Sequence, residues 1–179
     1  LFLQQLCSEL RLDNICRNIR NRHKFTYDFH AILTDLIYAR ILSPSSKMSS
    51  FSFCHSLLEA PKYSLQNVYR ALSVMAEESD YIQEELYRNS NFVHHRNSKI
   101  LYYDCTNYYF EIEYNDNDEY ELNDDGSIKL DKNGNKILKK KGYRKRGPEK
   151  NHRPDPIIEM GLLMDASGIP IAYNLFSGN

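Results

Sequence analysis

Residues 1–90 carry apolar side chains at three- and four-residue steps, the spacing that gathers them on one face of a helix. We expect helical segments at 1–24, 27–42 and 48–58, one that starts after Ser64, and one that starts after Ser79. Asp28, Ser64 and Ser79 are of the types that cap helix N-termini. The pattern therefore predicts an all-helical region whose apolar stripes are explained by core packing alone.

The apolar period changes to two at residues 99–113. One face of this segment would carry Ile100, Tyr102, Asp104, Thr106, Tyr108 and Phe110, and the other Leu101, Tyr103, Cys105 and Tyr109. Because both faces are mostly apolar, we expect an interior strand with Asp104 buried among aromatic rings. A buried carboxylate must pair, accept hydrogen bonds, bind a metal or take up a proton. On this strand alone, Asp104 can also be a hydrogen-bonded core residue or lie at a strand end.

A second pair of strands is predicted near the end of the chain. Residues 156–164 and 169–176 read as strands joined by the turn Asp165-Ala-Ser-Gly168. Pro170 lacks a backbone donor, so the return strand should begin at a sheet edge or at a bulge.

The segment at about 114–145 is polar and separates the two strand regions. Residues 111–131 hold nine acids and one base, whereas residues 132–153 hold ten bases and one acid, Glu149. Asp125-Gly126 and Asn133-Gly134 are hairpin-turn signals. We expect a small polar β-meander whose opposite charges stabilise neighbouring strands, or simply a solvated, self-neutralising excursion.

Two basic stretches are candidates for contact with nucleic acid. The stronger one comprises Lys139, Lys140, Lys141, Arg144, Lys145, Arg146, Lys150 and Arg153, for which we predict DNA phosphate contacts. The weaker one spans residues 11–24, where favourable cations at a helix C-terminus are the more ordinary explanation.

Overall composition excludes few functions. The formal net charge is −1, so the overall charge favours no particular class of binding partner. The four cysteines show no C-x-x-C spacing, which argues against a zinc ribbon or a redox pair and favours reduced thiols in the cytoplasm. Adjacent His94 and His95 would point to opposite faces of a strand, which disfavours a shared metal. No apolar run is long enough to span a membrane.

Three blocks of the chain resemble insertion-sequence transposases of the acidic-triad (DDE) class. They are Tyr102-Tyr-Asp-Cys-Thr-Asn-Tyr-Tyr-Phe-Glu111, Arg146-Gly-Pro-Glu-Lys-Asn-His-Arg-Pro-Asp-Pro156, and Gly161-Leu-Leu-Met-Asp-Ala-Ser-Gly-Ile-Pro-Ile171 with Leu175-Phe-Ser-Gly-Asn179. Leu72-Ser-Val-Met75 in the helical region also looks like this group, so the resemblance covers roughly residues 28–179. Glu149 departs from the pattern by placing an acid inside the basic stretch.

The resemblance implies an α+β chain: an all-helical amino-terminal region, then the first antiparallel strands of a ribonuclease H-like mixed sheet. Asp104 would be the first catalytic acid and a ligand of Mg²⁺ or Mn²⁺, and Thr106 could orient it. Two metal ions ~3.5–4 Å apart can activate the attacking oxygen and stabilise the departing one. The second Asp and the Glu of the triad would lie beyond Asn179; Asp165, in a turn, is not assigned to either. The implied partners are element-end and target DNA and, for the full-length protein, a second subunit.

We therefore expect a helical region at 1–98, with a possible DNA-binding role, and the start of a catalytic domain at 99–179. Because the chain lacks an initial Met and stops just after a strand, we expect an amino-terminal fragment that is inactive by itself. The alternatives are a non-catalytic DNA-binding or regulatory module, and a decayed relic with an exposed edge strand and poor solubility.

Overall fold

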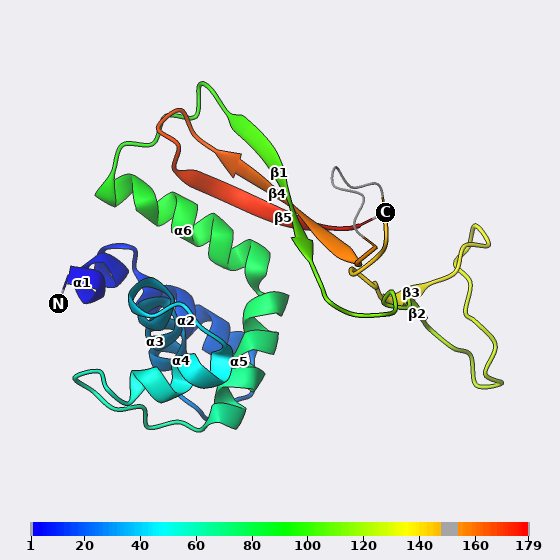
Figure 1. Ribbon diagram of the computed structural model, residues 1–179, viewed down its shortest axis with the longest axis horizontal. Coiled ribbons are helices and arrows are strands. Elements are labelled where there is room, and N and C mark those ends of the chain that lie inside the picture. The colour runs from blue at the N-terminus through cyan, green and yellow to red at the C-terminus, as the bar shows by residue number, and fades with distance from the viewer. Residues whose placement is uncertain (1, 148–153, 179) are drawn as a thin grey trace. The chain divides into compact units, whose positions relative to one another are not determined.

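The computed structural model describes residues 2–147 and 154–178, and it confirms the α+β class (Figure 1). The described residues form six helices followed by five strands. The chain divides into two compact units, Leu1–Arg96, which contains all of these helices, and Asn97–Asn179, which contains the strands.

The helices of the first unit follow the predicted apolar stripes. Their bounds are α1 Phe2–Glu9, α2 Leu12–Arg22, α3 Phe29–Leu42, α4 Lys47–Cys54, α5 Leu65–Glu77 and α6 Ser79–Val93. The segment predicted at 1–24 is two helices, because Arg11 takes a left-handed conformation (φ 54°) that ends α1. The stripes of α2, α3 and α5 meet in one core, around the fully buried Ile15, Ile19, Ile32 and Val68.

Two of the three predicted caps are confirmed. The Asp28 carboxylate accepts the Ala31 amide at 3.0 Å, and Ser64 and Asn67 form a reciprocal capping box at the start of α5. The prediction that Ser79 caps α6 is wrong. Helix α6 already includes Ser79, and its N-cap is Glu78, whose side chain makes no cap hydrogen bond because it binds Arg22 and His23 instead.

The larger sheet is antiparallel with the order β1-β4-β5 (Figure 1). Its strands are β1 Tyr102–Tyr109, β4 Ile157–Met164 and β5 Pro170–Ser177. Asp104 lies opposite Leu162 in the register, and Leu162 lies opposite Tyr173. The pairing of β4 with β5 shifts between Leu163 and Met164, next to Pro170, so the predicted bulge is confirmed.

Three tight turns share one sequence signal, an Asn or Asp followed three residues later by Gly. Gly126, Gly134 and Gly168 have φ of 82°, 83° and 74°, a conformation that glycine adopts without strain. In two of these turns an Asp at the first position, Asp131 or Asp165, accepts the backbone amides two and four residues further on, at 2.8–3.0 Å. Asp165 therefore lies in a turn, as expected, and it is also fully buried.

The insert (residues 114–145) folds as three hairpins around a ring of backbone hydrogen bonds. Glu121, Lys129 and Ile137, spaced eight residues apart, form this ring. The Lys129 amide donates to the Glu121 carbonyl at 2.8 Å, the Ile137 amide to the Lys129 carbonyl at 3.0 Å, and the Glu121 amide to the Ile137 carbonyl at 2.9 Å. The hairpins pair Leu122 with Ile128, Leu130 with Lys136, and β2 Glu119–Tyr120 with β3 Leu138–Lys140. The segment predicted as a small β-meander is thus a closed three-way junction, because each short strand divides its backbone hydrogen bonds between two neighbouring segments.

Candidate functional site

Asp104 lies at the middle of β1, but the expectation that it is buried is wrong. The side chains of Tyr102, Asp104, Thr106 and Tyr108 are all exposed. The reason is topological: β1 is an edge strand of a three-stranded sheet, and its apolar faces are not covered in the described structure. A strand with apolar residues on both faces is suited to burial. It becomes buried only where other elements of the structure pack on both faces of its sheet.

The three strands bring no second acid to the side of Asp104. They contain one other acid, Glu159, which pairs in register with Asn107 and so points to the opposite face. Across the described residues, no group of three or more acidic, histidine or cysteine side chains is placed to hold a metal ion. The carboxylate of Asp104 and the hydroxyl of Thr106 share one face as oxygen donors, and this is less than a two-ion site requires.

Three of the six described cations of the basic stretch pair with acids of the stretch before it. The Arg144 guanidinium binds Asp116 with Nη2–Oδ1 at 2.6 Å, and Lys145 Nζ lies 3.3 Å from Asp118. Lys140 Nζ lies 3.6 Å from Glu119. Donation from Arg144 holds the pKa of Asp116 below its usual range, and the pKa of Asp118 is lowered by the Gly142 amide and by Lys145. These cations and acids together fasten the base of the insert.

The remaining cations of this stretch are less engaged. Arg146 donates to the Glu113 carbonyl at 2.8 Å, and the Lys141 ammonium lies 5.6 Å from the centre of the Tyr143 ring. Lys139 is exposed and has no ion-pair partner among the described residues. Lys150 and Arg153 lie outside the described residues. Phosphate contact by this stretch stays a prediction. Among its described cations, Lys139, Lys141 and Arg146 form no ion pair with an acidic side chain, although the charge of Lys141 helps to lower the pKa of Asp118.

The cations at and after the end of α2 also include some that form ion pairs and some that do not. Arg17 pairs with Asp13 one turn earlier at 3.3 Å, with both side chains exposed. Arg22 is bound by Glu78, whereas Arg20 and Lys24 are exposed. The ordinary explanation, favourable cations near a helix C-terminus, accounts for Arg20 and Arg22.

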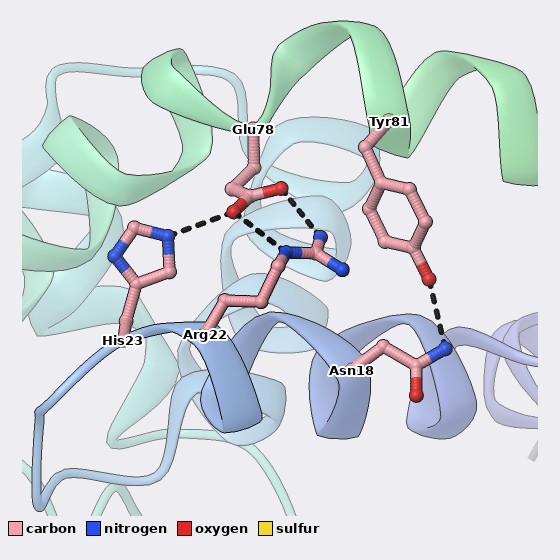
Figure 2. A network of polar contacts seen from close by, with 5 residues as sticks. All are labelled: Asn18, Arg22, His23, Glu78 and Tyr81. Carbon is pink, nitrogen blue, oxygen red and sulfur yellow. Dashed lines mark hydrogen bonds and ion pairs between the residues drawn. The ribbon is translucent and has the colours of Figure 1, made fainter.

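Figure 2 shows a polar network that the sequence pattern did not indicate. Glu78 accepts Arg22 Nε at 3.1 Å and Arg22 Nη2, and its Oε1 lies 2.8 Å from His23 Nε2. The Arg22 guanidinium lies 4.1 Å from the centre of the Tyr81 ring, and the Tyr81 hydroxyl accepts Asn18 at 2.9 Å. Donation from Arg22 lowers the pKa of Glu78. The network joins the end of α2 to the junction of α5 and α6, so its role is structural.

Among the described residues, the acid whose pKa is raised is Asp35 in α3, which sequence reasoning also missed. Burial raises its pKa, and Tyr63 donates a hydrogen bond to its carboxylate at 2.6 Å. The signal available in the sequence is an Asp inside the apolar run of the helix at 29–42. The charges of Glu59 and Asp28 also raise the pKa of Asp35, but no group of three metal-ligating side chains is found among the described residues. The Asp35–Tyr63 pair is therefore explained as a hydrogen-bonded contact of the helical unit.

The remaining chemistry is sparse. All four cysteines are free thiols, three of them buried and Cys105 exposed beside the Tyr103 hydroxyl at 3.3 Å. Among the described helices, none has the length and apolar character needed to cross a membrane.

Comparison with models of known protein families, with curated proteins and with solved structures finds no match to this chain.

Proposed function

We propose that this chain acts in DNA transposition, as a DDE-class transposase chain in which Asp104 is the first acid of a metal-dependent site on DNA. The observation that carries this proposal is the position of Asp104. It stands at the middle of the first of three antiparallel strands, in the order β1-β4-β5. A ribonuclease H-like sheet with the acid on its first strand would open in this way, and the three sequence blocks fit the same class.

The exposed carboxylate suits this role better than a buried one. A divalent ion with hard-oxygen preference binds through one or two carboxylates, retains waters and is completed by substrate phosphate. Asp104 is accessible to such a phosphate, and Thr106 on the same face offers a hydroxyl. Mg²⁺ or Mn²⁺ bound at two further acids would supply activation of the attacking oxygen.

The described residues do not complete a two-ion site, so no cleavage step is assigned to them. Asp104 is the single acid on its face of the three strands. We expect this chain alone to bind DNA weakly and to lack strand-transfer activity.

The direct test is a Mg²⁺ or Mn²⁺ cleavage assay on element-end DNA with the chain and its Asp104→Ala variant. The expected result is no cleavage by either. Robust cleavage that disappears in Asp104→Ala would show that the chain holds a complete site.

A non-catalytic DNA-binding module is the second candidate. It is favoured because the described residues place no second acid beside Asp104. Its contacts would come from Lys139, Lys141, Arg146 and the exposed Arg20 and Lys24. DNA affinity that falls with salt and is unchanged in Asp104→Ala would favour this module over a metal site. If no binding is measured at low salt, both candidates fail.

A further inference from the structure

The three-way junction of the insert has one exposed apolar side. Side chains alternate along each strand, so the paired even-numbered residues of the three hairpins point to the same side. The Lys136 ammonium lies 5.3 Å from the centre of the Tyr120 ring, which places two different hairpins on that side. We call this side the even face. It consists of Tyr120, Leu122, Ile128, Leu130, Lys136 and Leu138.

The apolar side chains of the even face are open to solvent. Leu122, Leu130, Leu138 and Ile128 are 62%, 54%, 44% and 37% exposed. The opposite side carries Glu121 and Lys129, which form an ion pair at 3.1 Å. An exposed apolar cluster with a charged border is typical of an interaction surface.

The border of the even face is charged asymmetrically. The turn of the first hairpin carries Asp124 and Asp125. The turn of the second carries Lys132 at its tip and Asp131, whose carboxylate accepts the Asn133 and Asn135 amides of its own turn. The third hairpin carries both signs, with Glu119 and Lys140 paired across its strands at 3.6 Å. The first two hairpins therefore present opposite charges at equivalent positions of an eight-residue repeat.

We propose that a second copy of this chain docks on the even face, with the two inserts related by a twofold axis that runs parallel to the plane of the junction, just outside the even face. Such an axis places the third hairpin of one copy on the third hairpin of the other. It also places the acidic first hairpin on the basic second hairpin, twice, as an isologous interface requires. Apolar side chains then pack against apolar side chains, and Asp124 of each copy faces Lys132 of the other. The charge complementarity selects a second copy as the occupant. This proposal does not depend on DNA or on Asp104.

The contact is small. Six residues a side is well below the roughly 20–30 of a standard interface, so the dimer should be weak and should depend on concentration. The charged turns should also make it sensitive to salt.

Sedimentation velocity of the full chain at increasing concentration, at low salt, tests the proposal. The expected result is a monomer–dimer equilibrium that Leu130→Asp abolishes, while Leu58→Asp, at a 98% exposed apolar residue of the helical unit, leaves it unchanged. Circular dichroism of each variant checks that the chain remains folded.

Charge reversal provides a second test that does not disturb the apolar packing. Asp124→Lys and Lys132→Asp should each weaken the dimer at least severalfold, and the double variant should restore it. Both side chains are exposed turn residues, so the fold should tolerate these changes. A chain that stays monomeric at every concentration, a dimer that survives Leu130→Asp, or a double variant that fails to restore association would overturn the proposal.

Discussion

The Arg144 guanidinium faces the Asp116 carboxylate across the base of the insert, with Nη2 2.6 Å and Nε 2.9 Å from Oδ1. The same two residues share two further hydrogen bonds. The Asp116 amide donates to the Arg144 carbonyl at 2.8 Å, and the Arg144 amide donates to the Asp116 carboxylate at 3.1 Å. The bidentate pair of Arg144 and Asp116 therefore joins the two ends of the insert.

The first prediction concerns this closure. Asp116→Asn removes the charge that Arg144 binds, so the base of the insert should open more often while the helical unit is unaffected. Amide hydrogen exchange should speed up at Asp116 and Arg144 and stay unchanged in α2 and α3. Asp124→Asn, at the exposed turn of the first hairpin, is the matched control. Equal exchange in both variants would show that the pair does not hold the insert closed.

The second prediction concerns the Glu78 network in the helical unit. Because the pKa of Glu78 is lowered in the folded chain, its stabilising contribution is present above the ordinary Glu pKa, near 4.3, and is lost as the pH falls through the folded value. Glu78→Gln should reduce the free energy of unfolding by about 1–2 kcal/mol at pH 7. The difference between the two proteins should shrink below about pH 4, as Glu78 becomes protonated.

Denaturant unfolding between pH 7 and pH 3 measures this difference. Glu84→Gln is a suitable control, because Glu84 pairs with Arg88 on the exposed face of the same helix, with both side chains more than 60% exposed. It should change stability little at any pH. A Glu78→Gln effect that does not vary with pH would contradict an origin in the carboxylate charge.

The helices, the turns and the β4–β5 hairpin could be predicted because each depends on neighbours in sequence. The cap at Ser64, the turn at Gly168 and the bulge next to Pro170 each involve residues close by in the sequence, so they can be predicted from local sequence alone. The exposure of Asp104 could not be predicted in this way. Whether Asp104 is covered depends on what packs on the sheet, and the sequence of β1 does not show this.

The ion pairs of the basic stretch could not be predicted, for a related reason. Composition shows that residues 111–131 and 132–153 carry opposite charge, but it does not show which charges meet. Arg144 and Asp116 are 28 residues apart, and their contact depends on the register of the hairpins between them. Likewise, the ring through Glu121, Lys129 and Ile137 follows from an eight-residue turn spacing that also suits an open meander.

The third prediction concerns Gly178, which is buried where β5 ends. A Cβ at this position would overlap the Lys145 carbonyl and the Ile157 backbone, which are bridged to each other. Backbone atoms cannot move aside as a flexible side chain can, so Gly178→Ala should cost about 1–3 kcal/mol in unfolding free energy. Ser167→Ala, at an exposed turn residue of the same unit, should cost little by comparison. Thermal unfolding of both variants would show whether the Lys145–Ile157 bridge needs this glycine.

The last prediction separates a metal-binding role of Asp104 from a structural one. Asp104 is exposed, and its side chain forms no hydrogen bond or ion pair with another described residue. A carboxylate whose role is to bind a metal ion should matter only when the ion is present. We therefore expect Asp104→Asn to leave the unfolding temperature unchanged without divalent ions, and to remove any increase in DNA affinity caused by Mn²⁺. Thr106→Val, on the same face, should reduce that increase less. Fluorescence anisotropy on element-end DNA, with and without Mn²⁺, measures the effect. A large loss of stability in Asp104→Asn would instead identify a structural acid, and an Mn²⁺ response that survives the substitution would place the ion elsewhere.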